Sequence, residues 1–104
     1  MASNISIGKG DSLTASTSAA VEYLVPNPTN GGGNNDFGDC LRIWNEGSVD
    51  VRVQINVETA AFTVATAMVI PAGKDHYVMN WKNPIKKFCY ATESSEATIK
   101  YAAN

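Results

Sequence analysis

Few side chains in this sequence are of types that perform catalysis, and their spacing matches no catalytic motif. Acid–base and nucleophilic chemistry need a base held next to an acid or nucleophile, and the single histidine is His76. Alternation within residues 75–81 places His76 on the face of Val78 and Asn80, and no Ser, His and Asp spacing resembles a known triad. The sequence therefore predicts an ordinary strand histidine and a protein that is not an enzyme.

Metal and cofactor sites are equally unsupported by residue spacing. Cys40 and Cys89 lie far apart and form no short-spaced ligand pair with the one histidine. Asp36 and Asp39 are oxygen donors suited to calcium, but they lie in a Gly-rich stretch that occurs once and is better explained as turn residues. The glycines 31–33 precede no Lys-Ser/Thr pair, which excludes a phosphate-binding loop. We predict no metal and no cofactor.

The two cysteines also bear on the redox state of the protein. Two are too few for a disulfide scaffold, so free thiols are the default expectation. Whether Cys40 and Cys89 pair is left open by the sequence.

Charge and hydropathy restrict the class of partner. The net charge is -2, which argues against a protein that grips phosphate backbones. The basic and aromatic stretch 81–87 would suit a single-strand binder, but a solvated loop or an acidic protein partner is the preferred interpretation. The longest run without polar residues, 67–72, is far short of the ~20 needed to cross a bilayer, and residues 1–12 do not form a signal peptide. Nucleic acid, membrane and export are not expected.

Arg42 and Trp44 are the most suggestive pair of side chains. Within residues 40–45, Leu41 and Ile43 alternate with Arg42 and Trp44, so the two pairs lie on opposite faces of a strand. Trp and Arg are enriched at protein interfaces. The alternative is that another part of the chain covers this face, and the sequence leaves both interpretations open.

Alternating hydrophobic residues predict the strands that position these side chains. Residues 50–58 alternate over their whole length, which indicates a half-buried strand. Residues 45–48 supply turn residues, including Gly47, which can take a positive φ, so we predict a hairpin of 40–45 with 50–58. Pro71 and Gly73 mark a second turn, between residues 67–70 and a return strand at 75–81.

The remaining segments complete an all-β architecture. Residues 12–25 predict one or two strands, and residues 85–91 and 97–102 predict a closing hairpin. Turns about every ten residues are typical of a sandwich or barrel. The predicted fold is a small antiparallel sandwich or barrel of about seven to eight strands, jelly-roll or immunoglobulin-like.

A chain of 104 residues has room for one domain. Residues 1–11 predict a flexible N-terminal arm, in which Ile5 and Ile7 alternate as an added strand would. We expect residues 12–104 to form a single β-sandwich domain. Residues 26–39 predict a long Gly-rich surface loop whose role the sequence does not assign.

Four stretches together resemble a known group of proteins. They are a Ser/Thr/Ala-rich opening strand, the pattern L-R-I-x-N-x-G-x-x-x-V-x-V at 41–53, M-V-I-P-A-G-K at 68–74, and A-T-I-K-Y at 97–101. This set resembles the small all-β virion proteins of tailed bacteriophages, of the capsid decoration or cement type. The resemblance implies a non-enzymatic protein that binds the capsid surface and stabilises the head.

Further expectations follow from this resemblance. It implies the major capsid protein or other virion proteins as partners, a homo-oligomer such as a trimer, and a place on the capsid surface after assembly in the host cytoplasm. Ile5, Ile7, Arg42 and Trp44 are the candidate contact residues. The alternatives are a neck or tail component, and a carbohydrate-binding module with Trp44, Tyr77 and Trp81 as stacking platforms. The host and the oligomeric state stay open.

Overall fold

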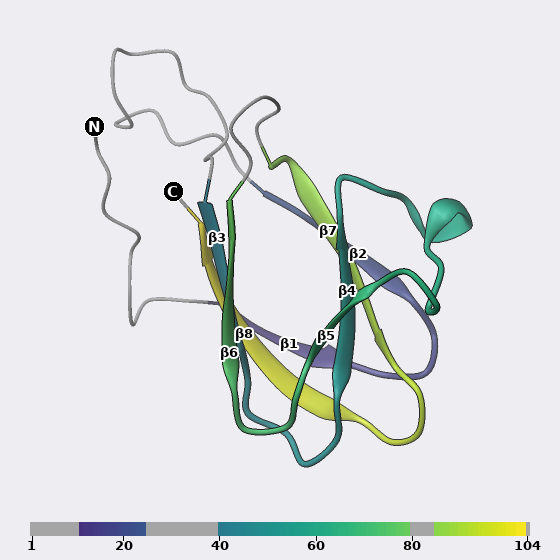
Figure 1. The fold of residues 1–104 in the computed structure, drawn as a ribbon, viewed down its shortest axis with the longest axis vertical. Coiled ribbons are helices and arrows are strands. Elements are labelled where there is room, and N and C mark those ends of the chain that lie inside the picture. The colour runs from purple at the N-terminus through teal and green to yellow at the C-terminus, as the bar shows by residue number, and fades with distance from the viewer. Residues whose placement is uncertain (1–10, 25–39, 80–84, 104) are drawn as a thin grey trace.

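The computed structural model describes residues 11–24, 40–79 and 85–103, which form two four-stranded antiparallel sheets packed face to face (Figure 1). One sheet has the order β1-β8-β3-β6 and the other β2-β7-β4-β5. The strands are β1 (Asp11–Ala15), β2 (Ala20–Tyr23), β3 (Cys40–Asn45), β4 (Val51–Ile55), β5 (Met68–Ile70), β6 (Asp75–Met79), β7 (Lys87–Thr92) and β8 (Ala97–Ala103), with a 3-10 turn η1 (Thr59–Ala61).

The strands pair in a nested order: the two central strands of the chain pair with each other, and each strand before them pairs with the corresponding strand after them. β4 pairs with β5, β3 with β6, β2 with β7 and β1 with β8, all antiparallel, while β3–β8 and β4–β7 pairs join these ribbons into sheets. This is the strand order of a jelly roll. The predicted all-β antiparallel sandwich is confirmed, and of the two predicted orders the jelly roll fits while the immunoglobulin order does not.

The predicted hairpins at 40–58, 67–81 and 85–102 are wrong. β3 and β4 belong to different sheets, as do β5 and β6, and β7 and β8. Their short turns carry the chain from one sheet to the other, and the consecutive strands that do pair are β4 and β5. Alternation reveals that each strand buries one face, but two such strands satisfy this pattern equally well side by side or face to face.

The core lies between the two sheets. Leu41 and Ile43 of β3 face Val51 and Val53 of β4 across it, and all four are fully buried, as their alternation predicted. The expected strand 50–58 ends early, at Ile55. The next residue, Asn56, has a φ of 58° and ends the strand.

Asn45 closes one end of the sandwich at the first turn between sheets. Its side chain is 2% exposed, and Nδ2 donates to the carbonyls of Val49 and Ile70, both at 2.9 Å. Its Oδ1 accepts from the backbone N–H of Gly47 at 2.9 Å. A Cβ at Gly47 would lie 2.5 Å from the Cβ of Ala97, so this glycine is needed for close packing. Among the described glycines the positive φ is at Gly73, so the predicted positive φ at Gly47 is wrong.

The predicted left-handed residue of the second turn is confirmed at Gly73, whose φ is 75°. This turn joins β5 to β6 and thus also connects the two sheets.

The segment 56–67, which joins β4 to β5, lies against the outer face of the β2-β7-β4-β5 sheet. The N–H of Thr63 donates to Oε1 of Gln54 at 3.2 Å, and Nη1 of Arg52 donates to the carbonyl of Val64 at 3.3 Å. Cys89 is the register partner of Gln54 on the neighbouring strand, so it lies on the same outer face, yet it is fully buried. The outer face of this sheet is therefore partly covered.

Both cysteines are free thiols, and they lie in different sheets. Cys40 is on β3, on the face of Arg42 and Trp44, and Cys89 is on β7, in register with Gln54. Packed sheets are about 10 Å apart, which exceeds the Cα separation of about 7 Å that a disulfide can span. This geometry accounts for the absence of a disulfide between Cys40 and Cys89.

Candidate binding surfaces

The outer face of the β1-β8-β3-β6 sheet carries a row of polar and aromatic side chains. Ser12, Lys100, Trp44 and Asp75 are successive register partners across the four strands, so their side chains share one face. Arg42 lies on the same face, two residues before Trp44. The structure thus places Arg42 and Trp44 on the outer face, opposite the buried side chains of their strand, as the alternation predicted.

Arg42 is held between an aromatic ring and a carboxylate. Its guanidinium carbon lies 4.1 Å from the centroid of the Trp44 ring. Its Nε and Nη2 donate to Oδ2 of Asp75 at 3.1 and 2.8 Å. Nearby, Nζ of Lys100 lies 3.7 Å from Oε2 of Glu46. Stacking and ion pairing together fix the orientation of Arg42 and Trp44 before any partner arrives.

This face is only partly accessible. The side chains of Arg42 and Asp75 are 17% and 42% exposed, and Trp44 is half-buried. Cys40 and Ala102, on the same face, are buried. The exposed part of the face therefore includes Ser12, Thr14 and Thr98 as well as the area around Trp44, Asp75 and Lys100.

Several predicted site residues lie outside the described part of the chain. These are Ile5 and Ile7 of the predicted arm, the loop 26–39, and Trp81; the side chain of Tyr77 lies outside it as well. Their predicted roles stay predictions.

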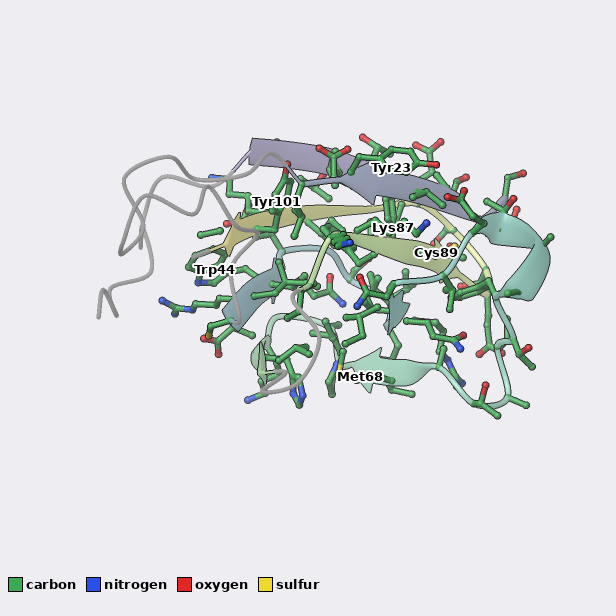
Figure 2. The ribbon with its side chains drawn as sticks, turned by 90° about the horizontal axis from the view of Figure 1, so that it is seen from above. Tyr23, Trp44, Met68, Lys87, Cys89 and Tyr101 are labelled. Carbon is green, nitrogen blue, oxygen red and sulfur yellow. The ribbon has the colours of Figure 1, made fainter. Side chains whose placement is uncertain are left out.

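The second surface is a cluster that sequence reasoning missed. Tyr23, on β2, is 59% exposed, and its hydroxyl lies 2.8 Å from both carboxylate oxygens of Glu58. Lys87, the register partner of Tyr23 on β7, places its Nζ 2.8 Å from Oε2 of Glu58 and 5.8 Å from the Tyr23 ring centroid. We call these three residues the Tyr23 cluster. Figure 2 shows Tyr23 and Lys87 near each other, with Trp44 well apart from both.

The hydrogen bonds of the Tyr23 cluster also set its ionisation. The Lys87 ammonium, and then the Tyr23 hydroxyl, hold the pKa of Glu58 below its ordinary value. In turn, the hydrogen bond to Glu58 raises the pKa of Tyr23 and that of Lys87. The cluster therefore presents a carboxylate, an ammonium and a neutral phenol around neutral pH.

Residues of catalytic type are dispersed over the described residues. His76 lies on the edge strand β6, is exposed, and shares a face with Val78, as predicted. Glu22 accepts a hydrogen bond from the Tyr101 hydroxyl at 2.6 Å and thereby joins the edge strand β2 to the facing sheet. Within residues 11–24, 40–79 and 85–103, no three His, Cys, Asp or Glu side chains gather where they could hold a metal ion.

Fold and surfaces together define an eight-stranded jelly-roll sandwich with two separate clusters of aromatic and charged side chains. A similar solved structure is that of PirA, with a TM-score of 0.55 over 91% of this chain and 93% of that chain. The two sequences are 13% identical, so the likeness shows a shared fold alone. No protein-family model matches the sequence, and no curated protein matches it either. The described residues contain no helix of the length and hydropathy that crossing a membrane requires.

Proposed function

We propose that the protein is a non-enzymatic structural protein of a bacteriophage particle, which binds the capsid surface and stabilises the head. The resemblance of residues 12–102 to small all-β virion proteins supports this proposal. Jelly rolls are common among capsid and lectin domains, which act by binding. The observation that carries the proposal is the fixed arrangement of Arg42 against Trp44 and Asp75 on an outer sheet face.

Arg42 and Trp44 have the properties of an interface anchor. Trp and Arg supply much of the energy of protein interfaces, and side chains ordered in advance lose less entropy when they dock. Lys100 and Glu46 provide charges of both signs beside them. A capsid protein surface with complementary charges would be oriented by this rim and anchored by Trp44.

Repetition would strengthen such a contact. A capsid presents many equivalent sites, and an oligomer such as a trimer would engage several at once. Linked contacts of modest affinity then bind far more tightly than each does alone. Since the bound protein prefers the assembled shell, it stabilises that shell by mass action.

The test is binding of the purified protein to capsids that lack it. We expect saturable co-sedimentation, and greater resistance of the decorated particles to heat. Trp44→Ala and Arg42→Glu should each weaken binding by about tenfold or more, as expected for loss of an anchor residue. Tyr23→Ala, on the opposite sheet, is the matched control and should bind like the parent protein.

Two results would overturn the proposal. One is a parent protein that never sediments with capsids; binding to isolated necks or tails instead would move it to that part of the particle. The other is that Trp44→Ala and Arg42→Glu, shown to fold by their thermal melts, both bind capsids as the parent does.

A further inference from the structure

The Tyr23 cluster lies apart from the proposed capsid contact, on the other sheet. We propose that Tyr23, Glu58 and Lys87 bind a sugar ring, which stacks on Tyr23 while its hydroxyl groups bond to Glu58 and Lys87. This site is on the outer face of the β2-β7-β4-β5 sheet, whereas Arg42 and Trp44 are on the outer face of the other sheet. It does not rest on the proposed function.

The Tyr23 ring is exposed and held in place. The residue is 59% exposed, and the Lys87 ammonium lies over its ring at 5.8 Å from the centroid. The hydroxyl at the far end of the ring is fixed by Glu58. The face of an aromatic ring carries partial negative charge, which is complementary to the C–H groups on the apolar face of a sugar.

The polar groups beside the ring retain capacity for further hydrogen bonds. An ammonium has three donors, of which Lys87 uses one on Glu58. A carboxylate accepts about four hydrogen bonds, and Glu58 accepts from Tyr23 and Lys87. Neighbouring sugar hydroxyls can donate to one of these groups and accept from the other. Because both groups are already oriented, binding costs little ordering.

The surroundings of the cluster favour a small ligand over a protein. Among the described residues the exposed large hydrophobic side chains are Tyr23 and Val69, which lie on the opposite edge strands β2 and β5. Cys89 and Ala91 lie between them, but both are buried. A stable protein interface buries about 1,200–2,000 Å² around an apolar centre. One exposed ring between two charged groups fits a ligand with a single apolar face.

The proposed sugar site at Tyr23 differs from the carbohydrate site that the sequence suggested. The predicted platforms were Trp44, Tyr77 and Trp81, and one ring face of Trp44 is occupied by the guanidinium of Arg42. Tyr23 lies on the short strand β2, and its hydrogen-bond partner Glu58 is 35 residues away in the sequence.

The experiment uses the full chain and defined sugar probes. Immobilised neutral hexoses, N-acetylhexosamines and their short oligomers are screened first; glucose, galactose and N-acetylglucosamine are then titrated in solution with amide shifts observed by NMR. We expect binding to at least one probe, with shift changes at residues 21–23 and 87. Tyr23→Ala should weaken it by about tenfold, the effect of losing roughly 1.4 kcal/mol of contact.

Further variants separate stacking from hydrogen bonding. Tyr23→Phe keeps the ring and should lose less than Tyr23→Ala, while Glu58→Gln should weaken binding and leave the ring in place. Trp44→Ala is the matched control and should bind sugar like the parent protein. If any variant fails to fold, the parent's shift changes still locate the site.

Absence of binding to every probe at about 10 mM sugar, tenfold above a millimolar Kd, would overturn the proposal. So would shift changes confined to residues elsewhere, or a folded Tyr23→Ala that binds as the parent does. Sugar binding is measured without capsids, so its failure and that of the proposed function are distinguishable.

Discussion

Replacement of Asn45 tests whether one buried amide holds the two sheets together. Asn45→Ala removes two donors, to the carbonyls of Val49 and Ile70, and one acceptor, from the N–H of Gly47. A typical hydrogen bond contributes about 0.5–1.5 kcal/mol net, and a buried group left without a partner costs more. We therefore expect a loss of about 2–4 kcal/mol in the free energy of unfolding, a large part of the 5–15 kcal/mol typical of a domain.

The assay is urea unfolding followed by circular dichroism and tryptophan fluorescence. We expect a lower midpoint with an unchanged m-value, since the same surface is exposed on unfolding. Asn45→Asp is the matched variant: it keeps an oxygen for Gly47 but turns a carboxylate toward two carbonyl oxygens. It should be less stable than Asn45→Ala at pH 7 and should recover in part at low pH, where a protonated carboxyl can donate. A loss below about 0.5 kcal/mol for Asn45→Ala, the range of a neutral surface change, would refute the reasoning.

Three further predictions concern packing and ionisation. Gly47→Ala should lower the free energy of unfolding by about 1–3 kcal/mol, measured in urea, because its Cβ would overlap the facing residue. Val53→Asp should prevent stable folding, as judged by circular dichroism, because an unpaired carboxylate would enter the core, whereas Gln54→Glu on the outer face keeps an acceptor and should fold. Lys87→Met should raise the pKa of the Glu58 carboxyl toward its ordinary value in a carbon-13 NMR titration. Since that pKa is lowered in the folded protein, the pairing favours folding at neutral pH, and this contribution is lost as the pH falls through the lowered pKa.

The sequence predicted which side of each strand is buried better than it predicted which strands are neighbours. Val51 and Val53 are buried because a period of two places every second residue on the core side. The same period carries no information on whether β3 lies beside β4 or opposite it. In the structure, Asn45 bridges the turn between the sheets by donating to the carbonyls of Val49 and of Ile70, at the end of β5.

The candidate surfaces were predictable only where they depend on a single strand. The outer position of Arg42 and Trp44 follows from their alternation with Leu41 and Ile43, but the ion pair to Asp75 depends on the register of β3 with β6. The three residues of the Tyr23 cluster come from separate segments: Tyr23 from β2, Lys87 from β7, and Glu58 from the segment that follows β4. Local periodicity contains no signal for such contacts between distant segments.

The nested pairing of the strands has a consequence for synthesis of the chain on the ribosome. β4 and β5 can meet as soon as both have emerged, but β2 must wait for β7, and β1 must wait for β8, nearly the whole length of the chain. A nascent chain halted before residue 97 would therefore contain β1 before its described partner, β8, had been synthesised. The backbone edges of β1 and β3 that pair with β8 would then lack this partner, so β8 completes the sheet that β1 begins.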